Sequence, residues 1–208
     1  MTSILWTSLL ALWAGLFQAN SSPIPTDKTT KVVENDRMVV WDVSWSGKPL
    51  TIPKHDLDMA IVYLAPPAKV GSVLYINKGV SRQEDGLTDS ARRAILVMLK
   101  DVKVPPLPLK SGLPPAFPRE NGKKLQENDR VTFWEYEWRP GKPMPMHHHI
   151  RQAVAVFLSE GQLRSVTPEG MVELSDTALG TVRAAAPGRI HTEEAVKGSP
   201  RAVIVELK

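Results

Sequence analysis

At 208 residues, with 42% hydrophobic content, the chain is long enough for one or two globular domains. Its net charge of +4 comes from Lys and Arg residues that are interspersed with Asp and Glu, and no basic stripe with interleaved aromatic residues is present, which argues against a nucleic-acid partner. The chain has no cysteine, which excludes disulfides, thiolate zinc sites and cysteine nucleophiles.

An apolar segment occupies residues 1–22. Ile4 to Phe17 contains no charged residue and precedes a polar stretch, a pattern typical of a signal peptide and too short for a membrane span. Because no Lys or Arg precedes the apolar core, an uncleaved anchor or a buried helix is the alternative. We expect a mature chain from about Pro23, secreted or periplasmic, without a stable membrane span.

A sequence repeat divides the rest of the chain. The segment ENDRMVVWDVSW (34–45) recurs as ENDRVTFWEYEW (127–138), and RAILVMLK (93–100) recurs as RAVIVELK (201–208). Self-similarity at both ends of a segment indicates two copies of one structural unit. We therefore expect copies at residues 32–103 and 126–208, the first being shorter by about one hairpin, joined by a Pro-rich linker at 104–125.

Each copy has the pattern of short β-strands. Residues 132–138 alternate between two sets of side chains, and residues 153–158 form a short apolar run. Thr167 to Gly170 is a turn that predicts a hairpin of 162–166 with 171–174, and further strands are expected at 181–185 and 201–207. Short strands with regular turns favour an all-β barrel or sandwich.

Three of the five histidines are consecutive, at His147, His148 and His149, and a fourth, His191, follows a Pro-Gly turn. On a strand, His147 and His149 point to one face and His148 to the other. With His191 delivered from a neighbouring strand, three imidazoles can share one divalent metal and leave coordination positions open. The alternatives are a solvated surface run for the His-His-His segment and a hydrogen-bonded loop histidine for His191.

These residues resemble the two motifs of the cupins. Gly141, His147, His149 and Gly161 match the first motif, and Gly180, Gly188 and His191 match the second, with Ala186 in its proline position. The resemblance covers about residues 32–208 and implies double-stranded β-helix (jelly-roll) barrels, two copies in tandem, as in a bicupin. It also implies a small-molecule substrate or ligand and a homodimer.

The sequence departs from the cupin pattern at one ligand. The glutamate of the first motif falls at Ala153 or Val154, neither of which binds metal. Gln152, brought in by a small bulge, or Glu193 on the strand of His191 are the candidate fourth ligands. A neutral, nitrogen-rich set favours Fe, Zn, Ni or Cu over Mn or Mg.

The first copy is expected to be metal-free. Aligned through the repeats, His55 corresponds to His147, Leu57 to His149 and Gln83 to His191. A surface or capping role is therefore expected for His55.

Aromatic residues near the histidines either wall a substrate pocket or simply belong to the core. Arg151 and Arg189 flank the two motifs and either orient an anionic substrate or lie on a solvated surface. The candidate pocket residues are Trp134, Tyr136, Trp138, Phe157 and Arg189.

Three functions follow, because one fold hosts many activities. The first is a metal-dependent enzyme, such as an Fe(II) dioxygenase or a Zn or Ni Lewis-acid enzyme. The second is an exported, non-catalytic module that binds metal or a small ligand. The third is a structural bicupin with a vestigial site.

Overall fold

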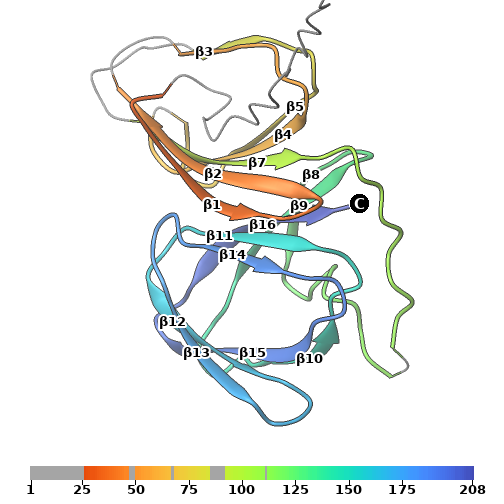
Figure 1. The fold of residues 1–208 in the computed structure, drawn as a ribbon. Coiled ribbons are helices and arrows are strands. Elements are labelled where there is room, and N and C mark those ends of the chain that lie inside the picture. Colours follow the sequence, from red (N-terminus) through yellow and green to blue (C-terminus); the bar gives the residue numbers. More distant parts are fainter. Residues whose placement is uncertain (1–25, 47–49, 67, 85–91, 111) are drawn as a thin grey trace, which may run out of the picture.

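The computed structural model describes residues 26–46, 50–66, 68–84, 92–110 and 112–208, in which the chain forms sixteen β-strands and no helix (Figure 1). The fold is therefore all-β, as the alternation and the turn spacing predict. No helix in these ranges is long and apolar enough to cross a membrane. The expected signal peptide lies outside the described residues.

The N-terminal half forms one five-stranded sheet and one small sheet. In spatial order the large sheet contains β1 (Lys28–Glu34), β2 (Met38–Trp45), β7 (Arg92–Leu99), β4 (Asp58–Tyr63) and β5 (Val73–Ile76), and the small sheet pairs β3 (Leu50–Ile52) with β6 (Arg82–Glu84).

The C-terminal half forms a barrel from two sheets. One contains β8 (Lys123–Glu127), β9 (Val131–Glu137), β16 (Arg201–Leu207), β11 (Ala153–Phe157) and β14 (Val182–Ala185), and the other contains β10 (Met144–His148), β15 (Ile190–Lys197), β12 (Gly161–Val166) and β13 (Val172–Thr177). The hairpin of β12 and β13 is the one that the turn at 167–170 predicts.

The two five-stranded sheets have the same topology. The order β1-β2-β7-β4-β5 corresponds strand by strand to β8-β9-β16-β11-β14. The register also agrees, since Met38 pairs with Leu99 where Val131 pairs with Leu207. β12 and β13 lie between β11 and β14, whereas the described residues between β4 and β5 contain no strand.

The repeated Glu-Asn-Asp-Arg segment forms the same turn twice. The side-chain oxygen of Asn35 accepts hydrogen bonds from the backbone N–H groups of Arg37 and Met38, and Asn128 caps the second turn in the same way. The arginine of each turn bonds to the other half of the chain. Arg37 donates to the carbonyl of Lys208 at 2.8 Å, and Arg130 donates to the carbonyl of Lys100 at 3.0 Å. Each turn therefore fastens its own half to the end of the other half.

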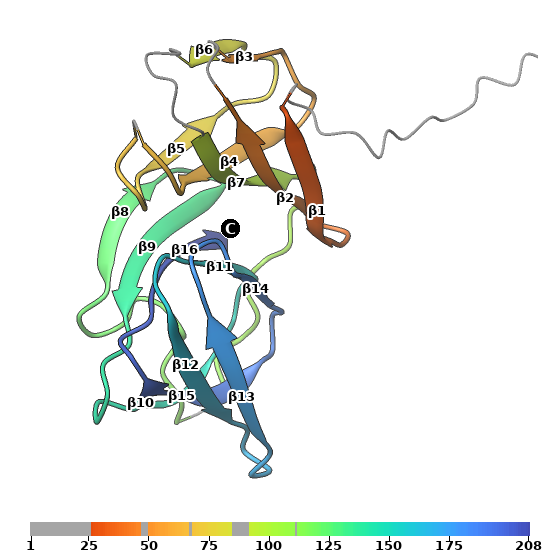
Figure 2. The same ribbon diagram turned by 90° about the vertical axis from the view of Figure 1, so that its left-hand side faces the viewer.

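The main core lies between the two five-stranded sheets, which stack face to face (Figure 2). Strand alternation sends one set of apolar side chains from each sheet into this layer, including Val40 and Val97 from the first and Phe133 and Val205 from the second. All four are fully buried, and each contributes about 1.5–3 kcal/mol of hydrophobic stabilisation.

The Pro-rich linker runs beside β10 and closes one side of the barrel. Leu107 donates its backbone N–H to the carbonyl of Ile150, and Ala116 donates to that of His148. Phe117 then enters the barrel and stacks on Trp134 with ring centroids 5.8 Å apart. The segment is thus extended and packed across the barrel, as its prolines and apolar residues indicate.

Candidate metal centre

Three buried imidazoles meet inside the C-terminal barrel. β10 and β15 are antiparallel neighbours whose register places His147 opposite His191. His149 follows the end of β10 and turns its ring to the same side as His147. The ring centroids are 4.6–5.2 Å apart, and one ligand atom from each ring lies within 4.8 Å of the others. The three residues are only 1–4% exposed, so a solvated surface run is wrong.

The Nε2 atoms of the rings have side-chain neighbours and no backbone partner in the described structure. The Nδ1 of His147 lies 3.0 Å from the carbonyl oxygen of Pro145, an acceptor that fixes the Nδ1–H tautomer, so its Nε2 carries a lone pair, 3.5 Å from Arg119 Nη2. The Nε2 atoms of His149 and His191 lie 3.1 Å apart, and the buried Nδ1 of each has no protein partner in the described structure. A cation shared by the Nε2 atoms fits this arrangement, because it uses the lone pairs that face one another.

The surroundings keep the imidazoles uncharged. Burial lowers the pKa of His149 to about 2 and that of His191 to about 4, and it also lowers the pKa of His147. Neutral imidazole is the form that binds a metal ion. The site is therefore ready for metal at neutral pH without the loss of a proton.

We expect the free energy of unfolding of metal-free protein to fall as the pH is lowered from about 6.5. The pKa values of His149 and His191 are lower in the folded chain than the ordinary 6.5, so the unfolded chain binds more protons in this range. The stabilisation is complete above about pH 6.5 and is lost as the pH falls through the folded pKa values. Urea unfolding between about pH 7.5 and about pH 4.5 measures the slope. The His149→Ala/His191→Ala variant should show a flatter slope, and an unchanged slope would contradict the assignment.

A carboxylate and a guanidinium flank the imidazoles. Glu193 lies two residues after His191 on β15, and its Oε1 is 3.8 Å from the Nε2 of that histidine. Its Oε2 accepts hydrogen bonds from Arg119 Nη1 at 2.8 Å and from Trp138 Nε1 at 3.0 Å. Burial favours the neutral acid and would raise the pKa of Glu193, but the positive charge of Arg119 outweighs burial, and the pKa falls to about 2. Glu193 is therefore an anion with one oxygen held and the other facing the histidines.

Gln152 is buried but does not line the small inner cavity that His149 and His191 line. Side chains alternate along a strand, and Ala153 and Ala155 line the cavity inside the barrel. If the alternation extends one residue before β11, Gln152 shares the opposite face with Val154, which lies in the core between the sheets. Of the two candidate oxygen donors, Glu193 is the one beside the site.

The predicted pocket residues divide between two cavities and the core. Trp138, Phe157 and Arg189 line a small cavity of about 60 Å³ next to His149 and His191. Tyr136 instead lines a larger cleft of about 930 Å³ that reaches His147.

Trp134 and Arg189 have other partners. Trp134 lines neither cavity; it stacks on Phe117, and its Nε1 donates to Glu206, so it is a core residue. The guanidinium of Arg189 lies 3.2 Å from Glu173 Oε2, so this half-buried charge is already paired.

His148 has a structural role that the sequence did not reveal. It is 6% exposed, its Nδ1 accepts the backbone N–H of Lys110 at 3.2 Å, and its backbone donates to the carbonyl of Pro114. His148 therefore fastens the linker to the outer side of β10 and points away from the metal centre.

The structure changes the correspondence between the first copy and the second that the sequence repeat predicts. The carbonyl of His55 accepts the N–H of Gly79, as the carbonyl of His149 accepts that of Gly188, so His55 corresponds to His149 and not to His147. Ile52 pairs with Arg82 where His147 pairs with His191. His55 is also not a surface residue, because it is 7% exposed and its Nδ1 contacts the carbonyl of Leu57.

Arg119 is the site residue that sequence reasoning missed. Its side chain is 3% exposed, and its guanidinium carbon lies 4.5–5.6 Å from the ring centroids of Phe117, Tyr136 and Trp138. Its Nε donates to the carbonyl of Ala116, and its Nη2 is 3.5 Å from the Nε2 of His147. An aromatic Phe-Pro-Arg segment in a linker carries no periodic signal, so only the folded structure places this charge.

No protein-family model matches the sequence, and no curated protein matches it. Solved structures do match. A cupin 2 conserved barrel domain protein from Leptotrichia buccalis has 12% identity and a TM-score of 0.55, covering 87% of this chain and 88% of its own. The protein Ylba from E. coli has 10% identity and a TM-score of 0.59, covering 93% and 88%.

A third match is a variant of salicylate 1,2-dioxygenase from Pseudoaminobacter salicylatoxidans, with 10% identity and a TM-score of 0.57, covering 82% of this chain and 70% of that one. At these identities the likeness concerns the fold. Together with the all-β topology and the barrel around the histidines, it shows that the chain has the fold of the cupin superfamily.

Proposed function

We propose that this protein is a metal-binding cupin whose C-terminal barrel holds one divalent ion through the Nε2 atoms of His147, His149 and His191. The observation that carries the proposal is the meeting of three buried, neutral imidazoles, in which the Nε2 atoms of His149 and His191 lie 3.1 Å apart. The donor set suits Fe, Zn, Ni or Cu. Glu193 supplies a nearby negative charge that offsets part of the charge of the ion.

The preferred activity is that of an Fe(II)-type dioxygenase or another metal-dependent enzyme that acts on a small molecule. Three protein ligands leave positions open, which is a property of catalytic sites. A bound Fe²⁺ would supply the redox chemistry with O₂. The chain's own residues would exclude water from the inner side, where Trp138 and Phe157 stack, and keep Arg119 and Glu193 beside the ion. The shared fold with salicylate 1,2-dioxygenase supports this choice.

The alternative is an exported, non-catalytic bicupin that binds metal or a small ligand. The small inner cavity favours it, because about 60 Å³ holds only a few waters. The equal strand orders of the two large sheets support gene duplication, with 32–103 as a degenerate copy and 126–208 as the metal-binding copy. Export depends on the apolar segment at 1–22, and mass spectrometry of the mature N-terminus would test it.

Elemental analysis of protein purified without a His tag tests the proposed function. We expect about one equivalent of a transition metal per chain, removable by a chelator and restored by dialysis against the ion. Oxygen uptake by the Fe²⁺-loaded protein with a panel of phenolic and thiol acids then separates the enzyme from the binding module. Absence of metal from protein purified and reloaded under these conditions would overturn the proposal.

A further inference from the structure

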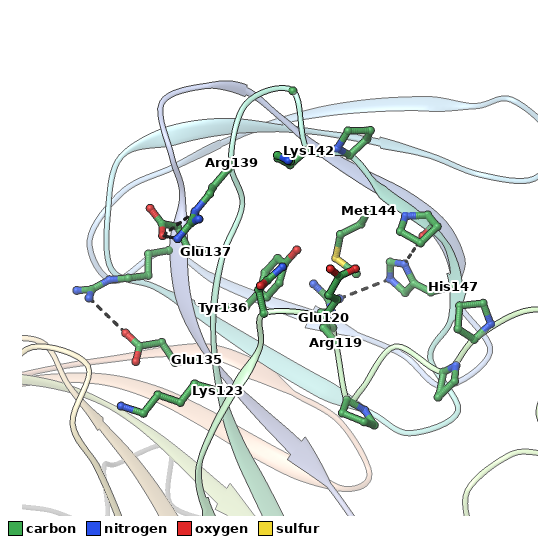
Figure 3. A pocket seen from close by; sticks show the side chains of 18 residues that line it. Arg119, Glu120, Lys123, Glu135, Tyr136, Glu137, Arg139, Lys142, Met144 and His147 are labelled. Carbon is green, nitrogen blue, oxygen red and sulfur yellow. Dashed lines mark hydrogen bonds and ion pairs between the residues drawn. The ribbon is translucent and has the colours of Figure 1, made fainter.

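The large cleft beside His147 is the feature that the metal site alone does not explain. It measures about 930 Å³ and lies between β9, the loop before β10 and the linker near Arg119 (Figure 3). This volume is at the upper end of the range of small-molecule sites. The ring of His147 forms part of its wall, so a molecule in the cleft lies next to the proposed metal ion.

Cationic groups outnumber carboxylates in this cleft. Arg119, Lys123, Arg139, Lys142 and Arg201 line it, against Glu120, Glu135 and Glu137. Two of the carboxylates are already paired, Glu137 with Arg139 at 3.0 Å and Glu135 with Arg201 at 3.2 Å. Within the described residues neither Lys123 nor Lys142 has a carboxylate within 4.0 Å, and the two ammonium groups lie on opposite sides of the opening (Figure 3). Lys123 and Lys142 can therefore pair with a bound anion.

Arg119 connects the cleft to the histidines. Among the described residues it alone lines both the cleft and the inner cavity. Glu193 and the carbonyl of Ala116 hold its Nη1 and Nε, whereas the one hydrogen-bond contact of its Nη2 within the described part of the chain is the 3.5 Å contact with His147. A guanidinium held in this way is preorganised, and its free N–H groups can donate to a carboxylate at little further cost in entropy.

Apolar surface accompanies the charges. Tyr136, Met144 and the rings of Pro115, Pro118 and Pro145 line the same cleft. An inorganic anion would leave this surface uncovered, whereas an acid with an aromatic or aliphatic body would cover it.

We propose that this cleft is the ligand site of the protein and that it binds an organic carboxylate. Arg119 would hold the acid group, Lys123 and Lys142 would add positive potential from the two sides of the opening, and the apolar body would lie against Tyr136 and Met144. The use of this ligand as a substrate depends on the proposed metal function. Binding of the acid does not depend on it, so the two proposals can fail separately.

Calorimetric titration with 1-naphthoate and with its neutral analogue 1-naphthamide tests the site, on metal-loaded and chelator-treated protein. We expect the acid to bind about tenfold more tightly than the amide. The Lys123→Gln/Lys142→Gln variant, which changes two exposed side chains, should lose most of this preference, and Arg119→Gln should lose it entirely. Lys197→Gln, an exposed change on β15 outside the cleft, is the matched control and should keep the preference.

Each outcome decides one of the two proposals. Equal affinity for acid and amide, or a preference that survives in the double-lysine variant and in Arg119→Gln, would overturn the ligand site even if metal is bound. Preference for the acid in protein that never binds metal would support the ligand site and refute the metal function. Preference that is lost equally in Lys197→Gln would show a nonspecific charge effect and would also overturn the inference.

Discussion

Replacing His191 by alanine is expected to reduce the metal content from about one ion per chain to a trace, with an affinity loss of at least about 100-fold, because even outer partners of metal ligands contribute 10–100-fold. The variant removes one of three nitrogen donors and leaves His147 and His149 too few to hold a divalent ion in competition with a chelator. Elemental analysis after gel filtration and a chelator competition measure the effect. Circular dichroism of the same sample checks that the barrel is still folded.

Two other histidines are the controls for this prediction. His148→Ala removes the bond to the backbone of Lys110, which costs about 0.5–1.5 kcal/mol of stability, but leaves the metal content unchanged. His55→Ala lies in the N-terminal half and should also keep the metal. If His148→Ala or His55→Ala lost as much metal as His191→Ala, the loss would reflect general destabilisation and the ligand assignment would be wrong.

The strands of the C-terminal half could be predicted from the sequence because their signals are local. Period-two alternation in 132–138 and the turn at 167–170 depend only on neighbouring residues, and both appear in the structure as expected. The grouping of His147 with His149 follows from the same alternation. Its partner His191 was found through motif spacing, which the pairing of β10 with β15 explains.

The predictions that failed depended on register or on distant contacts. Ile52 corresponds to His147, and His55 corresponds to His149. One more residue lies between Ile52 and His55 than between the two histidines, and this extra residue puts the sequence alignment of the first copy out of register. A shift of one residue also decides the face of a strand, and Gln152 is one residue before Ala153, which lines the inner cavity. The partners of His148 and Arg119 come from linker contacts between segments 38 and 74 residues apart, which no local pattern predicts.

Replacing Glu193 by glutamine is expected to destabilise the metal-free protein by about 3–5 kcal/mol, the range for breaking one side of a buried ion pair. The pair joins Arg119 and Glu193 at 2.8 Å, with side chains only 3% and 12% exposed. Without the carboxylate, the guanidinium remains buried among Phe117, Tyr136 and Trp138, with no carboxylate at its Nη1. Urea unfolding at neutral pH measures the loss.

Two matched variants show whether the loss comes from the uncompensated charge. The Arg119→Met/Glu193→Leu variant should recover most of the stability, since replacing a whole buried pair by apolar residues is often neutral. Glu137→Gln breaks the exposed pair with Arg139 and should cost at most about 1 kcal/mol.

The pH dependence gives a further check. Because the pKa of Glu193 is about 2 in the folded chain, against an ordinary value of 4.5, the Arg119–Glu193 pair stabilises the protein fully above about pH 4.5 and less as the pH falls toward 2. The difference between wild type and Glu193→Gln should therefore narrow in acid; a difference that is small at neutral pH, or equal to that of Glu137→Gln, would show that Glu193 does not hold Arg119 at the site.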